Sequence, residues 1–405
     1  MSTVGVSIFP VEGRVQNYAW GGHEALPGFL GRQPDGRPWA EWWLGAHPQA
    51  PSTVGSVPAT TLDRLVGTDP AQMLGGAVRT RFGPRLPFLL KVLDVETPLS
   101  LQVHPSVDQA VAGFRSERPH GVPAPADPLY ADEWAKPEML LAITRFDAFA
   151  GLRPRAGVLA RLDVLGGQRL GRLAEQLRRD QSAGAVRGVV EHLLRLDGDE
   201  RAAVVQEARE GIEQLRRERA PESRELEVSA ALAERYPDDP AVVVSVLMNH
   251  VMLEPGEAMA VPAGLLHCYT SGLALEIQST SNNTLRAGLT SKRVDVGEVL
   301  RIVDATAGPT FVRPSEPAPG LETFHAGFDD FTLDRICLRG GSPFILGAGT
   351  PAIILAMDGT LHLSSPDAAT DIRRGESVFV PATVGPVEIS GLGEAVRARP
   401  GLPEV

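Results

Sequence analysis

Cysteine is nearly absent from this chain, which has only Cys268 and Cys337 among its 405 residues. Two thiols with no CxxC spacing are too few for the disulfide framework of a small secreted domain. Such a sequence is consistent with a reducing compartment. We expect both cysteines to be core residues rather than nucleophiles.

Long apolar stretches and runs of positive charge are also missing. The sequence contains no span of about 18 apolar residues, the length needed to cross a bilayer. Its first residues lack the basic and apolar regions of a secretory signal. We therefore expect a cytoplasmic protein without a membrane partner. The net charge is −11, and no run of Lys or Arg could neutralise a series of phosphates, which excludes nucleic acid as an expected partner.

Three regimes of composition divide the chain. Residues 1–151 are rich in Pro, Gly and short apolar runs, as strands and turns require. Residues 152–241 place apolar side chains three and four positions apart between Arg and Glu, which predicts amphipathic helices. Short strands return over 242–313, and a proline-rich connector leads into 314–405. We predict a mainly β protein with a discontinuous first domain (1–151 and 242–313), a helical insertion (152–241) and a second β domain (314–405).

A faint internal repeat supports two related β units. The stretches "PGEAMAVPAGLLH" at 255–267 and "RGESVFVPATVGP" at 374–386 share Gly-Glu, an apolar pair and Val-Pro. Five residues beyond the proline the first copy has His267, whereas the second has Pro386. Only the first copy can bind a metal at that position.

The stretch "LSLQVHPS" at 99–106 alternates strictly, as a half-buried strand does. With a period of two, Gln102 and His104 share one face and can reach a common centre. Another donor, Glu138, precedes an apolar run that predicts the next strand. Gln102, His104, Glu138 and His267 form a mixed oxygen and nitrogen set that suits zinc, although manganese or iron is also chemically acceptable.

The spacing Gly256, Pro262, Gly264, His267 resembles the second conserved motif of the cupins, which are small jelly-roll barrels. A closer resemblance, to the class I phosphomannose isomerases, covers several ordered segments: "QNYAWGG", "LPFLLKVLDVETPLSLQVHPS", "KPEML", "LEPGEAMAVPAGLLHCYTSG" and "NNTLRAGLTSKRVD". It implies a cupin catalytic domain with a helical insertion and a second, degenerate C-terminal jelly roll. It also implies interconversion of mannose 6-phosphate and fructose 6-phosphate.

The same resemblance implies roles for individual residues. It makes Gln102, His104, Glu138 and His267 the ligands of one zinc ion per chain, and Arg286 the catalytic arginine. The residues that it places around the sugar phosphate are Lys91, Ser100, Lys136, Tyr269, Glu276 and Lys292.

The isomerisation moves a proton between C2 and C1 through a cis-enediol, so a base, an acid and a polarising group must converge. Glu276 and Lys136 are both candidates for the base, because burial and a metal can tune either group. Alternation in "LALEIQ" turns Glu276 into the barrel. Arg286 stays protonated and is expected to position or stabilise the substrate. The chain has no GxxxxGK[ST] loop, so we expect Arg286, Lys292 and Arg293 to meet the phosphate.

Two positions depart from the family pattern. Members commonly have His immediately before the Lys-Pro-Glu triplet, where this chain has Ala135, and often have Asp where it has Asn282. The effect of these exchanges on activity stays open. The tryptophans of "WAEWWLG", Trp39, Trp42 and Trp43, are expected to fill core rather than bind sugar.

Two other functions remain possible at this point. A non-catalytic sugar-phosphate-binding cupin would keep His104 and His267 without needing an acid, a base and an arginine. A metal-dependent cupin enzyme could also act on another substrate. The expected partner in each case is a small molecule, and we expect the chain to be a monomer.

Overall fold

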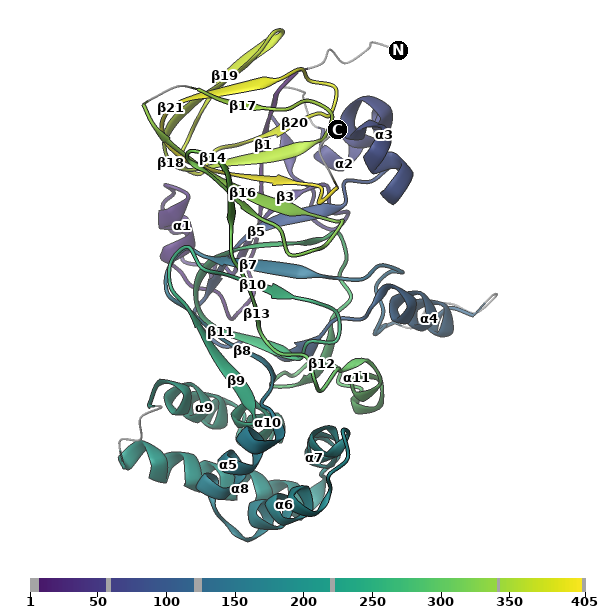
Figure 1. Cartoon of the computed structure of the whole chain (residues 1–405), viewed down its shortest axis with the longest axis vertical. Helices are drawn as coiled ribbons and strands as arrows, with labels where there is room; N and C mark the ends of the chain where they lie inside the picture. Colours follow the sequence, from purple (N-terminus) through teal and green to yellow (C-terminus); the bar gives the residue numbers. More distant parts are fainter. Residues whose placement is uncertain (1–6, 56–59, 120–125, 219–222, 341–342, 403–405) are drawn as a thin grey trace.

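The computed structural model describes residues 7–55, 60–119, 126–218, 223–340 and 343–402. Figure 1 shows three bodies along the long axis of the molecule: a β body near the C-terminus, a second β body in the middle, and a group of helices at the other end. The predicted fold class, mainly β with a helical insertion, is confirmed. The first six residues, which bear on the expected absence of a signal sequence, lie outside the described ranges.

The middle body is built on what we name the central sheet, which has 11 strands in the described part of the chain. Its main path is β13-β10-β7-β11-β5-β3-β2. Strands β6 and β8 also pair with β11, β12 pairs with β6, and β9 pairs with β8. The strands are β2 (Arg14–Gln16), β3 (Glu41–Gly45), β5 (Phe88–Val95), β6 (Leu101–Val103), β7 (Glu138–Ala142), β8 (Phe146–Leu152), β9 (Met248–Leu253), β10 (Ala258–Val261), β11 (His267–Ser279), β12 (Leu285–Gly288) and β13 (Thr310–Val312).

Strand β11 organises the central sheet because its two halves pair with different strands. Its first residues pair with β6 and β8, and its later residues pair with β5 and β7. Strands β5 and β7 are buried along their whole length, as apolar runs of this kind predict for strands covered on both sides. The charged groups of these strands are therefore buried with them.

The other β body is built on the distal sheet, which has 10 strands in the described ranges, ordered β14-β15-β16-β21-β18-β20-β1-β4 with β17 and β19 beside β21 and β18. Its strands are β1 (Phe9–Glu12), β4 (Thr53–Val54), β14 (Ser315–Ala318), β15 (Leu321–Phe324), β16 (Thr332–Arg339), β17 (Phe344–Leu346), β18 (Ala352–Ser365), β19 (Ala368–Arg373), β20 (Ser377–Val380) and β21 (Val387–Arg399).

The predicted division of the chain differs from the strand pairing at one point. Strand β1 lies within the predicted first domain, yet it pairs with β20 of the distal sheet. Strand β4 then pairs with β1. The reason is burial, because Phe9 and Val11 share one hydrophobic cluster with Phe331 and Phe379 of the distal body. Phe88 and Leu275 of the central sheet belong to the same cluster, so the two β bodies share a core.

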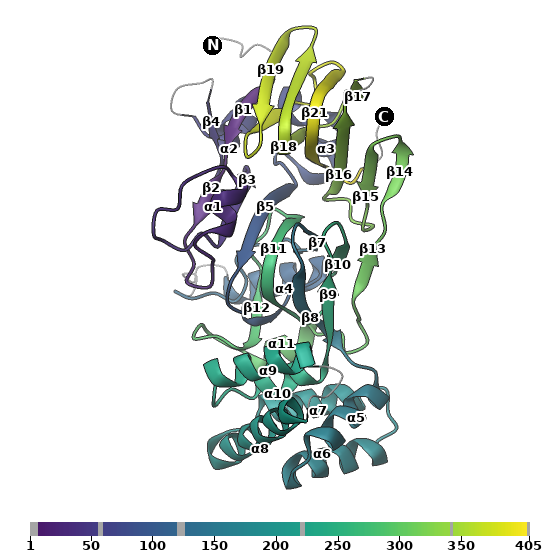
Figure 2. The ribbon, with the colours of Figure 1, turned by 90° about the vertical axis from the view of Figure 1, so that its left-hand side faces the viewer.

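The helical insertion lies beyond the central sheet (Figure 2) and has six helices in its described residues. They are α5 (Arg155–Leu165), α6 (Gln168–Arg179), α7 (Ala185–Leu194), α8 (Gly198–Arg217), α9 (Ser223–Arg235) and α10 (Ala241–Val246). Their apolar faces join one cluster with Phe149, Leu266 and Cys268 of the central sheet. Cys268 is thus a core residue as expected, and Cys337 is half-buried.

Outside the insertion, the described part of the chain has five further helices. They are α1 (Ala25–Phe29), α2 (Leu62–Thr68), α3 (Pro70–Phe82), α4 (Val107–Glu117) and α11 (Val296–Ile302). Helix α4 begins where "LSLQVHPS" ends, because the Ser106 side chain accepts from the Gln109 backbone N–H and the Gln109 side chain accepts from the Ser106 N–H. Among the helices of the described ranges, none is long and apolar enough to span a bilayer.

Candidate metal centre and substrate cavity

Two rows of side chains cross the central sheet where neighbouring strands are in register. Gln102 of β6 lies opposite His267 of β11 on one side and Arg286 of β12 on the other. Lys91 of β5 lies opposite Trp43 of β3 and Glu276 of β11. Residues directly opposite in an antiparallel pair are close enough to interact, so strand register alone gathers polar groups from distant segments.

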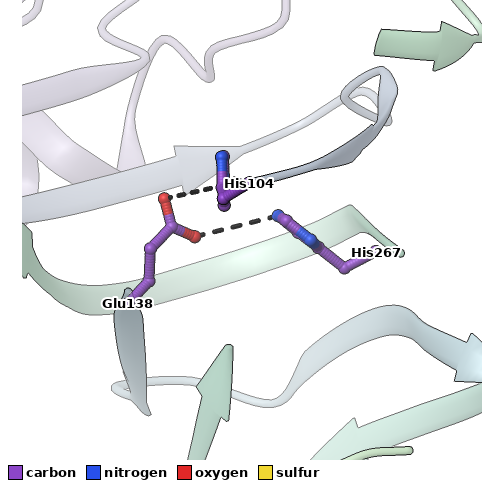
Figure 3. Close-up of side chains that lie close together, drawn as sticks. All are labelled: His104, Glu138 and His267. Carbon is purple, nitrogen blue, oxygen red and sulfur yellow. Dashed lines mark ion pairs between the residues drawn. The ribbon is translucent and has the colours of Figure 1, made fainter. Parts of the chain in front are cut away.

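Three buried donors form a candidate metal centre. The His104 Nε2 lies 3.2 Å from Glu138 Oε1, and the His267 Nε2 lies 3.8 Å from Glu138 Oε2. Figure 3 shows the Glu138 carboxylate facing both imidazoles, with one oxygen toward each. One ligand atom from each residue lies within 4.8 Å of the others, and all three side chains are buried. This geometry allows one cation to contact all three.

The hydrogen bonds of the two histidines determine which ring nitrogen is unprotonated. The His104 Nδ1 lies 2.7 Å from the Asn283 carbonyl oxygen, and the His267 Nδ1 lies 3.0 Å from that of Leu265. A carbonyl only accepts, so both Nδ1 atoms carry the proton and both Nε2 atoms present a lone pair. The buried His104 Nε2 has no hydrogen-bond partner in the described structure, as expected of a metal ligand.

The protonation states of the three side chains also favour cation binding. Burial, with Lys136 adding to it, lowers the pKa of His104, and burial with His104 lowers the pKa of His267 to about 3. Burial alone would raise the pKa of Glu138, but Lys136 and His104 outweigh it and hold that pKa well below its usual value. At neutral pH the site has two neutral imidazoles and one carboxylate. These are the protonation states that a metal requires of its ligands.

Gln102 offers a fourth donor beside the cluster. Its Nε2 lies 3.2 Å from the His267 Nε2, and its Oε1 accepts from the Ser100 hydroxyl at 3.3 Å. The two ends of an amide have similar shapes, so a rotation that presents Oε1 to a cation needs no other change. The combined set has nitrogen and oxygen donors and no sulfur, which fits zinc.

A cavity of about 490 Å³ adjoins this centre. The predicted site residues that line it are Lys91, Ser100, Gln102, Lys136, Glu138, Tyr269, Glu276, Arg286 and Lys292. His104 and His267 lie beneath its surface and are fully buried. The structure therefore brings the predicted metal ligands and these cavity residues to one place, whereas Arg293 lies outside it. The volume of the cavity is in the range of small-molecule sites.

The buried charges of the cavity are paired. The Lys91 Nζ lies 2.9 Å from Glu276 Oε2 and 3.7 Å from Glu41 Oε2, and the Lys136 Nζ lies 2.7 Å from Glu138 Oε1. Burial and the Glu138 charge raise the pKa of Glu276 to about 7. Burial alone would lower the pKa of Lys91, but Glu276 and Glu41 outweigh it, so Lys91 keeps its charge.

Arg286 and Lys292 line the same cavity without such partners. No carboxylate of the described residues lies within ion-pair distance of either, and Arg286 makes one hydrogen bond of 3.4 Å to the Thr284 carbonyl. Burial lowers the pKa of both groups, and Arg286 lowers that of Lys292 further. Arg293 differs from the prediction, because it does not line the cavity and donates to the Asp127 carbonyl at 2.6 Å. The two unneutralised cations favour an anionic ligand.

The two departures from the family pattern have local partners. The Ala135 carbonyl accepts from the Ser279 hydroxyl at 2.6 Å, so the backbone there is fixed without a histidine. The Asn282 amide lines the cavity and donates to Gln49 Oε1 at 2.7 Å. Its backbone N–H donates to Asp132 Oδ2 at 3.1 Å, so a carboxylate still lies beside this position.

Comparison with known families identifies two parts of the chain. The profile described as phosphomannose isomerase type I, catalytic domain, matches residues 8–155, and that of the mannose-6-phosphate isomerase cupin domain matches residues 321–400. Mannose-6-phosphate isomerase of Salmonella typhimurium is 33% identical over 392 residues, with 95% of this chain and 97% of the relative covered. The chain belongs to the mannose-6-phosphate isomerase family.

Other family members are similar to this chain over nearly its whole length. The Escherichia coli enzyme is 33% identical over 389 residues, covering 95% of this chain and 97% of its own, and the human enzyme is 29% identical with 93% of each chain covered. A crystal structure of a phosphomannose isomerase mutant from Salmonella typhimurium gives a TM-score of 0.89 at 31% identity and covers 98% of this chain and 100% of its own. A mannose 6-phosphate isomerase bound with zinc and yttrium gives a TM-score of 0.87 at 31% identity, with the same coverage.

Several cavity residues of this family member were missing from the sequence predictions. Trp43 is buried as expected, but it also lines the cavity, 5.0 Å from the Lys91 Nζ to the ring centroid. Glu41 lies beside it, and the alternation of "EWW" does put Glu41 and Trp43 on one face. Tyr18, which belongs to the segment "QNYAWGG", and Arg235 also line the cavity, and no local pattern indicates Arg235.

Proposed function

We propose that this chain is a zinc-dependent aldose-ketose isomerase that interconverts mannose 6-phosphate and fructose 6-phosphate. The observation that carries the proposal is the buried cluster of His104, Glu138 and His267 beside a cavity with two unneutralised cations. The related mannose-6-phosphate isomerases support the same substrate. The geometry favours this function over a purely binding role, because Glu276 lines the same cavity as an additional ionisable group.

We infer that one zinc ion per chain is held by Gln102, His104, Glu138 and His267. The support is the donor chemistry of the four residues and the zinc in a related solved structure. Bound zinc supplies Lewis-acid polarisation of the substrate oxygens, an effect that contributes several kcal/mol in enzymes. The second-layer hydrogen bonds from the Asn283 and Leu265 carbonyls orient the two imidazoles.

Glu276 is our preferred general base. It removes the C2 proton of the aldose, which gives a cis-enediol, and it returns a proton to C1. A second proton passes from the C2 hydroxyl to the former carbonyl oxygen on C1, so the ketose forms without any external reactant. Lys136 fits this role less well, because its Nζ lies 2.7 Å from Glu138 Oε1 and is occupied with a proposed ligand. Lys91, 2.9 Å from Glu276, holds the base in place.

The remaining residues bind and polarise the substrate in this proposal. Arg286 keeps its proton at any working pH and stabilises negative charge on the enediol oxygens or positions the phosphate. Lys292 adds positive charge at the same cavity. Tyr269 donates its hydroxyl to Glu138 Oε2 at 3.1 Å, and Ser100 bonds Gln102, so both also hold the metal ligands in place.

The test is an isomerase assay on zinc-loaded protein, with Arg286→Ala and a matched control, Arg293→Ala. Arg293 belongs to the same segment but lies outside the cavity. We expect Arg286→Ala to lower kcat/KM by roughly 10²- to 10³-fold. Arg293→Ala should match the wild type within about twofold, and both variants should melt normally.

Other outcomes of these experiments would contradict the proposed function or its mechanism. Tight binding of mannose 6-phosphate with zero turnover would make the chain a sugar-phosphate-binding cupin. Turnover of a different sugar phosphate, or iron with consumption of dioxygen, would make it another metal-dependent cupin enzyme. Equal activity of wild type and Arg286→Ala would show that the assigned mechanism is wrong.

We further propose the domain division 1–151 with 242–313, 152–241 and 314–405, and a monomer in the cytoplasm. The two free thiols support a reducing compartment. This division keeps β1 in the first domain, although β1 pairs with β20 of the distal sheet. Light scattering on the purified chain tests the monomer, and a dimer mass would contradict it.

A further inference from the structure

The helical insertion reaches the substrate cavity at one point. Arg235, the last residue of α9, and Tyr236, which follows it, line the cavity together with residues of the central sheet. Figure 2 shows α9 directly beyond the strands of the middle body. A segment that the sequence predicts only as amphipathic helices therefore contributes surface to the site.

Helix α9 is fixed to the central sheet at its other end. Glu225 is buried and accepts from Arg153 at 2.7 Å and from Arg161 at 2.6 Å. Arg224 donates to Asp147 Oδ2 of β8 at 2.6 Å. A helix held by buried ion pairs at its start is a rigid element, so the position of Arg235 at its end is set by the fold rather than by a flexible loop.

The segment after α9 also shapes the loop that carries the other cations. Asp239 Oδ2 accepts from the Leu289 backbone N–H at 2.6 Å. Leu289 has a φ of 56°, and it is the one non-glycine residue of the described ranges with a positive φ. Such a conformation costs a leucine roughly 1–2 kcal/mol and persists only where neighbours impose it. The insertion therefore holds the chain between Arg286 and Lys292.

Charge distribution assigns a role to this end of the cavity. The carboxylates Glu276 and Glu138 are paired with Lys91 and Lys136. Within the described residues, no carboxylate lies within ion-pair distance of Arg235. Its guanidinium is a third unneutralised cation that lines the same cavity as Arg286 and Lys292. A phosphate monoester carries about −1.5 to −2 charges at neutral pH, so three cations match it better than two.

We propose that Arg235 binds the phosphate group of the sugar phosphate, so that the helical insertion supplies part of the substrate site. The proposal rests on the proposed function for the identity of the ligand. Arginine suits this task, because its planar donors can form two parallel hydrogen bonds to phosphate oxygens. Arg235 is exposed, and its replacement leaves no buried group without a partner.

The experiment compares Arg235→Ala and Arg235→Lys with Arg172→Ala. Arg172 is an exposed arginine on α6 of the same insertion, and it does not line the cavity. The readouts are KM and kcat for mannose 6-phosphate, and calorimetric affinity for mannose 6-phosphate and inorganic phosphate. We expect Arg235→Ala to raise KM and both dissociation constants roughly 5- to 20-fold, with kcat within about twofold. Arg235→Lys should recover most of the loss, and Arg172→Ala should match the wild type.

The calorimetry separates this proposal from the proposed function. A wild type that binds mannose 6-phosphate without turnover would contradict isomerase activity, yet a weaker affinity in Arg235→Ala would still support the phosphate contact. Equal affinities of Arg235→Ala and Arg172→Ala would overturn the contact even in an active isomerase. A wild type that binds neither ligand would overturn both.

Discussion

The strand β10 of the central sheet and the strand β20 of the distal sheet begin with the same hydrogen-bonded turn. In both, a Gly-Glu pair precedes a buried strand of four residues, and the glycine has a positive φ of 89° at Gly256 and 80° at Gly375. The Glu257 side chain accepts from the Glu254 N–H at 2.9 Å, and the Glu376 side chain accepts from the Arg373 N–H at 2.9 Å. The repeat seen in the sequence is thus one β unit used twice.

The two units differ in what faces the interior. After its proline the central unit reaches His267, which opens β11 and joins a cluster of buried charges. At the corresponding position the distal unit has Pro386. Its sheet packs around an apolar cluster that includes Ile354 and Ala356. Turn chemistry and apolar alternation therefore specify the fold, and a few inward-facing residues specify whether it has a site.

The largest expected effect separates the histidines of the two units. His267→Ala removes a proposed ligand, and we expect loss of bound zinc and a fall in activity of roughly a thousandfold or more. His362→Ala is the control, because His362 is exposed and pairs with Asp371 on the distal sheet. Metal analysis and the isomerase assay measure both. Full zinc content in His267→Ala would contradict the assignment.

Buried charge in the distal body should matter for stability alone. Asp334 is buried and accepts from Arg397 at 2.6 Å and from Arg399 at 2.9 Å. Asp334→Ala leaves buried positive charge without this partner, so we expect about 3–5 kcal/mol less unfolding free energy. Denaturant unfolding measures the loss, and kcat per folded molecule should stay unchanged. A change in KM would show that the distal body takes part in the reaction.

The same aspartate gives a pH dependence. Burial alone would raise the pKa of Asp334, but Arg397 and Arg399 outweigh it and hold that pKa below its usual value. A depressed native pKa stabilises the fold above the unfolded pKa of about 3.9, and the benefit is lost as pH falls through the native value. The difference between wild type and Asp334→Ala should therefore shrink below about pH 4. A constant difference would contradict the pairing.

The two turn glycines sharpen the comparison. A Cβ at Gly375 would lie 2.6 Å from the Leu30 carbonyl oxygen, whereas one at Gly256 would meet only the end of the Arg335 side chain, at 3.1 Å. Both alanine variants are strained by the positive φ, and Gly375→Ala must also displace the backbone at Leu30. We expect losses of about 2–4 kcal/mol for Gly375→Ala and about 1–2 kcal/mol for Gly256→Ala. Thermal unfolding would contradict this if the order were reversed.

The smallest effect should be equal in the two units. Glu257→Ala and Glu376→Ala each remove one exposed side-chain hydrogen bond to a turn N–H. We expect about 0.5–1.5 kcal/mol for each, measured by denaturant unfolding. A difference larger than that between the two variants would mean that the turns are not equivalent.

Residues that act through short sequence spacing could be predicted. The period of two placed Gln102 and His104 on one face, and the turn residues around Pro262 located His267 at the start of a strand. The fold class followed from the change between strand and helix periodicity. These patterns are local, so one sequence contains them.

Contacts that depend on how distant elements pack could not be predicted. The pairing of β1 with β20 joins opposite ends of the chain, and apolar alternation does not name a partner. Arg235 looks like any arginine of an amphipathic helix, because only the docking of α9 brings it to the cavity. Sequence also left the base open between Glu276 and Lys136, and the contact of Lys136 with Glu138 separates them.

Diffraction at the zinc absorption edge, from crystals grown with zinc, tests the central claim most directly. The claim is that one of the two β units became a metal site and the other did not. We predict one strong anomalous peak per chain, coordinated by Gln102, His104, Glu138 and His267, and none in the distal body. Absence of that peak, or a zinc ion bound through His362 and Asp371 instead, would contradict it.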